Sequence, residues 1–120
     1  MKTHGLIWAG LFVENLEAAV VFYRDQLGLP LRSHGADFAH FDAGEGALFE
    51  VFSGGKAVSG PKGPELQPLV VSFRVDDLPA AMQELKAKGV SFIGEMGEYK
   101  GTRWASFCDP EGNLLELKQI

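Results

Sequence analysis

Two glutamates, Glu50 and Glu116, hold equivalent positions in two similar halves of the sequence. If the halves face each other, both carboxylates line one cleft. Neighbouring carboxylates in a partly dry pocket resist ionising together, so one could hold a proton near neutral pH and act as a general acid or base. The pair could instead attract an ammonium or guanidinium group. Alternatively, each glutamate is an ordinary polar residue on a solvated sheet face.

Further side chains could support this chemistry. His40 could serve as a base or as a substitute metal ligand, although a lone histidine is often structural. Arg74 could pair with either glutamate, meet an anionic ligand, or form a salt bridge at the rim. Cys108 has no adjacent base and is expected to be inert. Five aromatic side chains could stack on a flat or cationic ligand, or simply fill the core: Trp8, Phe12, Phe38, Phe52 and Trp104.

An internal repeat must position these residues. Residues 13–20 match residues 75–82 at an offset of 62, and residues 39–50 match residues 105–116 at an offset of 66. A four-residue insertion explains the change of offset, and the Gly-rich residues 94–101 can hold it. Internal repeats are the first signal of architecture. The sequence therefore predicts one domain over residues 1–120, with module one at 5–53, a linker at 54–68 and module two at 69–120.

Composition limits the class of protein. The 120 residues are 46% hydrophobic, enough for one core, and carry a net charge of -5. An acidic chain disfavours nucleic-acid and anionic-membrane partners, because those need clustered Lys and Arg. It weakly favours cationic ligands. One cysteine allows no internal disulfide and the start does not read as a signal peptide, so a cytoplasmic location is expected.

Each half is predicted to form a strand, a helix and three further strands. In module one, Asn15 caps a helix that starts at Leu16 and stops at Gly28. In module two, Asp77 caps a helix that starts at Leu78 and stops at Gly89. The expected strands are 6–13, 30–34, 37–42 and 47–53, then 69–75, 91–94, 102–108 and 113–118.

Two connections have particular sequences. Residues 109–112, Asp-Pro-Glu-Gly, predict a hairpin turn between the last two strands. Residues 94–101 are expected to form a polar loop that could close over the cleft or serve only as a connector. The linker at 54–68 could carry the chain between the modules or allow modules to swap between subunits.

Strand alternation separates the two faces of each sheet. The repeated Ala and Phe residues at 39, 41, 105 and 107 are predicted to face the helices, together with Leu115 and Leu117. The opposite, concave face then holds the candidate ligand-binding residues, which are Trp8, Phe38, His40, Glu50, Val70, Trp104, Ser106 and Glu116. It is aromatic, with two carboxylates, a histidine and a serine.

Over nearly its whole length the sequence resembles the vicinal oxygen chelate superfamily. The resemblance rests on Val-Asp-Asp-Leu at 75–78 before a helix, on Phe-Tyr-Arg-Asp at 22–25 followed by Leu-Gly-Leu at 27–29, and on Asp-Pro-Glu-Gly-Asn-Leu-Leu-Glu-Leu at 109–117. It implies an α+β fold of duplicated βαβββ modules, as in glyoxalase, bleomycin resistance protein and dihydroxybiphenyl dioxygenase, which form an incomplete barrel-like cleft. Fold alone does not fix the chemistry.

The resemblance also implies where a metal would lie. In glyoxalase-like members the ligands come from the first and fourth strands of each module, and the matching positions here are Trp8, Glu50, Val70 and Glu116. Indole and isopropyl groups offer no lone pair suited to a divalent ion. We therefore expect no metal cofactor. Any Zn, Ni, Fe or Mn would rest on Glu50 and Glu116, with His40, His4 or water completing the shell.

Two functions follow. The first is a metal-free protein resembling the bleomycin-resistance branch, expected to be a homodimer, which binds a small aromatic or cationic molecule at the module or dimer interface. The second is a glyoxalase- or dioxygenase-type enzyme, in which Glu50, Glu116 and His40 surround a divalent metal that polarises the substrate's vicinal oxygens. The missing ligands at positions 8 and 70 favour binding.

Overall fold

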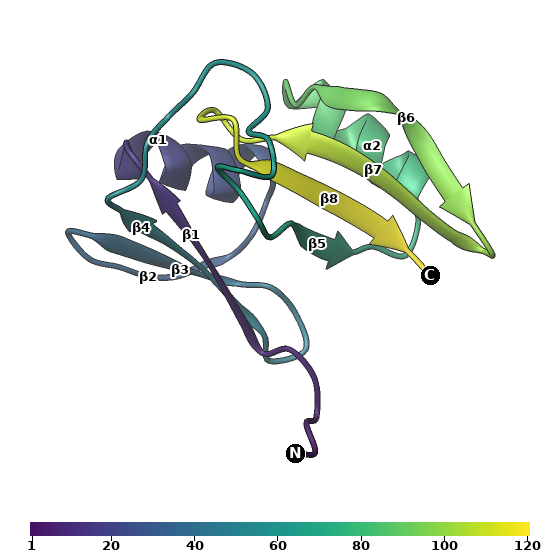
Figure 1. Cartoon of the computed structure of the whole chain (residues 1–120), viewed down its shortest axis with the longest axis horizontal. Coiled ribbons are helices and arrows are strands. Elements are labelled where there is room, and N and C mark those ends of the chain that lie inside the picture. Colours follow the sequence, from purple (N-terminus) through teal and green to yellow (C-terminus); the bar gives the residue numbers. More distant parts are fainter. The chain divides into compact units, whose positions relative to one another are not determined.

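The computed structural model describes residues 1–120. These residues form two compact units, Met1–Lys56 and Ala57–Ile120. Each unit is a four-stranded mixed sheet with helical structure against one face (Figure 1). The predicted α+β class and the two repeated modules are confirmed. The sheets do not close into a barrel. Neither α-helix has the length and apolar character needed to span a membrane.

The first module follows the predicted order of elements. Its elements are β1 (Trp8–Val13), α1 (Leu16–Val21), η1 (Phe22–Gln26), β2 (Leu31–His34), β3 (Phe38–Asp42) and β4 (Leu48–Ser53). The strands lie in the order β1-β4-β3-β2, with β1 and β4 parallel and the other neighbours antiparallel. Asn15 caps α1 as predicted, since its side chain accepts from the Ala18 amide at 3.1 Å.

The helix of this module changes type before it ends. From Phe22 to Gln26 it is a π-helix, in which the Leu27 amide donates to the Phe22 carbonyl at 2.9 Å. Phe22 and Tyr23 are both buried, with their rings 5.0 Å apart and edge to face. Gly28 then adopts a φ of 81°, the left-handed conformation expected at the helix stop.

The second module repeats the plan. Its elements are β5 (Val71–Arg74), α2 (Leu78–Ala87), β6 (Phe92–Tyr99), β7 (Thr102–Cys108) and β8 (Leu114–Gln119). The strand order is β5-β8-β7-β6, again with the outer first strand parallel to the last. Asp77 caps α2, accepting from the Ala80 amide at 3.0 Å.

The prediction of a polar loop at residues 94–101 is wrong. Strand β6 runs on to Tyr99, and only Lys100 and Gly101 form a turn to β7. Both turn residues have positive φ, 48° and 82°, which suits the twist of a two-residue hairpin. A register shift between Ile93 and Gly97 takes up extra residues. The insertion therefore lengthens a hairpin and does not supply a lid.

The predicted faces of the sheets are confirmed. The helix-facing side chains at positions 39, 41, 49 and 51 are at most 1% exposed, and those at 105, 107, 115 and 117 at most 3%. Full burial of each large apolar side chain stabilises the fold by about 1.5–3 kcal/mol. Because alternate residues point to opposite faces, this core fixes His40, Glu50 and Glu116 on the faces away from the helices.

The end of the linker is bonded to the second module. The amides of Val58 and Lys62 donate to the carbonyls of Glu111 and Gly112 at 3.0 and 2.8 Å. The Gln67 side chain pairs with both backbone groups of Leu114, at 2.7 and 2.6 Å. The predicted turn at 109–112 is present, with the Gly112 amide donating to the Asp109 carbonyl at 3.2 Å. The boundary between the compact units accordingly falls at Lys56 and Ala57, inside the predicted linker.

Candidate functional site

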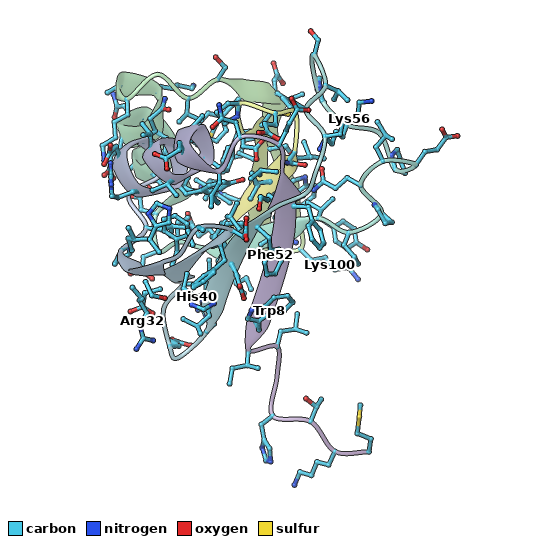
Figure 2. All side chains as sticks on the ribbon, turned by 90° about the vertical axis from the view of Figure 1, so that its left-hand side faces the viewer. Trp8, Arg32, His40, Phe52, Lys56 and Lys100 are labelled. Atoms are coloured by element: carbon cyan, nitrogen blue, oxygen red, sulfur yellow. The ribbon has the colours of Figure 1, made fainter.

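The face of the first sheet away from the helix gathers the candidate residues of module one. Register places His40 opposite Glu50 and Phe38 opposite Phe52 across β3 and β4. Trp8, from β1, lies on this same face. Figure 2 shows the side chains of Trp8, His40 and Phe52 from these three strands. We call this surface, with Ser33 of β2, the module-one face.

Glu50 is the centre of this face. Its Oε1 atom accepts from the indole Nε1 of Trp8 at 3.0 Å and lies 3.0 Å from Nε2 of His40. The Glu50 side chain is only 15% exposed. Both contacts use Oε1, so Oε2 is left to accept a hydrogen bond from a ligand. A partly buried carboxylate held in this way is a preorganised acceptor for a positively charged donor.

Gly10 gives Trp8 the space to reach Glu50. It is paired with Glu50 in the register of β1 and β4. A Cβ atom at this position would collide with the rings of Trp8 and Phe52. Because residue 10 has no side chain, the indole of Trp8 can lie across the backbone of its own strand.

His40 joins Glu50 to a serine. Its Nδ1 atom lies 2.8 Å from Oγ of Ser33, which is opposite it on β2. A carboxylate can only accept, so neutral His40 must carry its proton on Nε2. The lone pair of Nδ1 then accepts from the hydroxyl of Ser33. These contacts fix both the orientation of the ring and its tautomer.

Aromatic rings flank this polar chain. Phe52 lies 5.9 Å from Trp8 and 4.9 Å from Phe12, measured between ring centroids. Phe38 lies 5.0 Å from the His40 ring. Trp8 and Phe12 are 50% and 59% exposed, so their surfaces are open to a ligand. Flat or cationic groups are attracted to such exposed rings.

The matching face of the second sheet has different chemistry. Glu116 lies opposite Ser72 and Ser106, and Oε1 of Glu116 is 3.5 Å from Nζ of Lys118. Trp104 lies against Gly97 of β6, where a Cβ would collide with the indole. Val70 is 47% exposed and precedes β5. A lysine thus stands beside the glutamate here, where module one has a histidine and an indole.

Sequence reasoning missed two residues of these faces. Lys118 is the cation beside Glu116, a role that the sequence analysis assigns to Arg74 as one possibility. Because Lys118 follows Glu116 by two positions on the same strand, strand alternation alone places both side chains on one face. Ser33 could not be found in this way. The register of β2 shifts between Leu31 and Ser33, and that shift determines which residue meets His40. The prediction that Glu50 and Glu116 share one cleft stays a prediction.

The donor set does not fit a metal centre of the kind that the resemblance implies. The indole at position 8 has an N–H that donates to Glu50 and no lone pair for an ion. Val70, at the corresponding position of module two, has no donor atom. Within either module no three His, Cys, Asp or Glu side chains gather in a way that could hold a metal ion.

Cys108 lies outside this chemistry. Its Sγ atom is 3.8 Å from the Gly112 carbonyl oxygen. Burial, and then the neighbouring charge of Asp109, raise the pKa of the thiol above its ordinary value. A raised pKa lowers the fraction of reactive thiolate, in agreement with the expectation that this cysteine is inert.

The two βαβββ modules have the duplicated fold of the vicinal oxygen chelate class. The sequence profile of the Glyoxalase/Bleomycin resistance protein/Dioxygenase superfamily matches residues 5–117. The chain belongs to this superfamily.

Individual relatives agree with this assignment. The chain is 29% identical to the uncharacterized protein YraH of Bacillus subtilis (strain 168), covering 96% of this chain and 98% of YraH. Lactoylglutathione lyase from Agrobacterium tumefaciens has a similar structure, with a TM-score of 0.78, 19% identity and coverage of 99% and 96% of the two chains. Fosfomycin resistance protein FosX from Mesorhizobium loti gives a TM-score of 0.70 at 15% identity, covering 99% and 94%. At these identities the solved structures establish the fold alone.

Proposed function

We propose that this protein binds a small aromatic cation on the module-one face, without a metal ion. The observation that carries the proposal is the partly buried carboxylate of Glu50, held through Oε1 by Trp8 and His40 and leaving Oε2 to accept from a ligand. A hydrogen bond between charged groups contributes about 1.5–3 kcal/mol. The ligand would place a positively charged N–H group at Oε2.

The exposed rings support the aromatic half of the proposal. Trp8, Phe12 and Phe52 form a connected cluster beside Glu50. A cation over such a ring contributes roughly 0.5–2 kcal/mol, and flat rings add stacking energy. A molecule that is both planar and cationic uses the carboxylate and the rings together. The acidic net charge of -5 also attracts cations.

The donor chemistry supports binding over metal-dependent catalysis. A lyase or dioxygenase of the glyoxalase or extradiol type would need lone pairs at positions 8 and 70, which carry Trp and Val. We also propose that the protein is a homodimer in the cytoplasm with a small molecule as its partner. Equilibrium sedimentation of the purified chain tests the oligomeric state directly.

A fluorescence titration tests the binding site. Proflavine, a planar cation with amino groups, is compared with its neutral parent acridine at pH 8, and emission from the two tryptophans is followed. We expect proflavine to bind more tightly, and Glu50→Gln to weaken it by roughly tenfold, which corresponds to about 1.4 kcal/mol. Glu17→Gln, in the first turn of α1, is the matched control and should leave the affinity unchanged. Equal binding of both dyes, or no effect of Glu50→Gln, would contradict the proposal.

A further inference from the structure

We propose that Ser33, His40 and Glu50 form a nucleophile, base and positioning group that accept an acyl chain from small activated esters. Their side chains form one continuous hydrogen-bonded chain across β2, β3 and β4. Oγ of Ser33 is 2.8 Å from Nδ1 of His40, and Nε2 of His40 is 3.0 Å from Oε1 of Glu50. A hydroxyl, a base and a third group that orients the base are the diagnostic arrangement of an activated nucleophile.

The arrangement depends on an irregularity in β2. Phe41 pairs with Leu31, so regular antiparallel pairing would bring Arg32 opposite His40. The register shift between Leu31 and Ser33 brings Ser33 there instead. A bulge that redirects a side chain in this way is often found beside an active site. The irregularity therefore places a hydroxyl, and not a guanidinium, on the lone pair of His40.

The proton positions suit base catalysis. Glu50 only accepts, so it holds the proton of neutral His40 on Nε2 and leaves Nδ1 free to take the hydroxyl proton of Ser33. In serine proteases Nε2 of the histidine faces the serine and Nδ1 faces the carboxylate, whereas here Nδ1 faces the serine and Nε2 faces the carboxylate. The chemistry is the same, because a neutral imidazole has one donor and one acceptor in either arrangement. Trp8, donating to the same oxygen of Glu50, holds the carboxylate in place.

The nucleophile is accessible. Ser33 is exposed on β2, the outer strand of the first sheet, and the His40 side chain is 31% exposed. Glu50 is more deeply placed, at 15% exposure. A small ester can therefore approach Oγ from the open side of the sheet. The carboxylate behind the imidazole stays partly screened from water, which strengthens its interaction with the imidazolium.

The reaction balances without an added cofactor. Oγ of Ser33 attacks the ester carbonyl carbon while its proton passes to Nδ1 of His40. The bond from the carbonyl carbon to the leaving oxygen breaks, and the alcohol or phenol departs with the proton from Nδ1. Water then attacks the acyl-serine in the same way, releasing the acid and restoring Ser33. The imidazolium formed in each step is paired with Glu50.

The test is acylation by p-nitrophenyl acetate. Release of p-nitrophenolate is followed by absorbance, and the modified residue is found by intact and peptide mass spectrometry. We expect one acetyl group on Ser33. Ser33→Ala and His40→Asn should slow release by at least about a hundredfold, since general base catalysis contributes roughly 10²–10⁴. Ser59→Ala is the matched control, because Ser59 is an exposed serine of the linker that belongs to neither candidate face.

Glu50 is tested as a positioning residue. Glu50→Gln offers an amide donor, which can move the imidazole proton from Nε2 to Nδ1 and remove the base from Ser33. The nitrogen chemical shifts of the His40 ring should report this change of tautomer, and acylation should fall with it. A loss of acylation with the tautomer unchanged would remove Glu50 from this role.

Three results would overturn the proposal. They are an acetyl group on any residue other than Ser33, release by Ser33→Ala as fast as by the wild type, and no acylation of the wild type. Ser33→Ala is checked for an unchanged circular dichroism spectrum. Proflavine binding is measured on the wild type in parallel, because the proposed contacts of the dye use Oε2 of Glu50 and the aromatic rings and not the hydroxyl of Ser33. Failure of acylation with intact proflavine binding would therefore leave the binding proposal standing.

Discussion

The indole of Trp8 donates a hydrogen bond to Glu50 at 3.0 Å. These two positions are those at which the family resemblance implies metal ligands from the first and fourth strands of module one. The side chain at position 8 therefore does more than remove a donor atom from a metal shell. Trp8 donates to Oε1 of Glu50, the same oxygen that His40 contacts, so the Glu50 carboxylate is part of a hydrogen-bonded chain.

Trp8→His should create metal affinity. The change puts an imidazole beside Glu50 and His40, which already lie in contact, so one module would offer three ligands. We expect zinc to raise the melting temperature of W8H and to leave that of the wild type unchanged, since a ligand that binds only the folded state stabilises it. Trp104→His, on the second sheet, is the control. An equal rise in the melting temperature of the wild type with zinc would contradict the inference that Trp8 prevents metal binding at Glu50.

Gly10→Ala should disturb the module-one face. The added Cβ collides with the rings of Trp8 and Phe52, and such overpacking costs about 1–3 kcal/mol. Urea denaturation should show this loss, and the tryptophan emission should shift as the indole moves. Gly63→Ala is the matched control, because a Cβ there meets nothing within 4 Å. Equal stability of the two variants would show that Trp8 does not depend on Gly10.

Much of the module-one face could be predicted from alternation. Buried Phe41 and Phe49 fix the odd-numbered positions on the core side, so His40 and Glu50 must share the other face. Their contact then follows from register. Ser33 could not be predicted, because the irregular pairing around Arg32 has no local sequence signal.

Two other differences from the prediction, in the β6 region and in the first helix, have separate causes. The Gly-rich residues 94–101 read as a loop, but pairing with β7 keeps them extended up to Tyr99. The π-helix from Phe22 to Gln26 shares the apolar spacing of an α-helix, so periodicity indicates a helix without giving its type. Helix caps were predictable, since Asn15 and Asp77 act through amides only three residues away.

Asn113→Ala should destabilise the second module. Asn113 is buried, and its side chain donates to Oδ2 of Asp109 and accepts from Nζ of Lys62, both at 2.8 Å. Removing a partner from a buried polar network costs about 1–3 kcal/mol. Urea denaturation should give a loss of this size. Lys62→Met removes only the contact between Lys62 and Asn113, so it should lower the stability by less. An equal loss of stability in the two variants would mean that the contact of Asn113 with the linker, and not its bond to Asp109, accounts for the destabilisation.

Cys108 should react slowly with thiol reagents. Burial raises the pKa of this thiol, so at pH 8 the thiolate fraction is smaller than that of a free cysteine, and it grows as the pH rises through the folded pKa. Ellman's reagent should modify the native protein more slowly than the urea-unfolded protein, with a rate that is still rising above pH 9. Equal rates in the two states would contradict the shift.

The proposed function requires Glu50 to take part in ligand binding on the module-one face without a metal ion. Crystals of the protein grown with proflavine, from material whose metal content has been measured by elemental analysis, test it most directly. We predict less than stoichiometric metal, and an amino group of proflavine at Oε2 of Glu50 with its rings against Trp8 and Phe52. One tightly held metal ion per chain on Glu50, lost in Glu50→Gln, would rule out metal-free binding at this face.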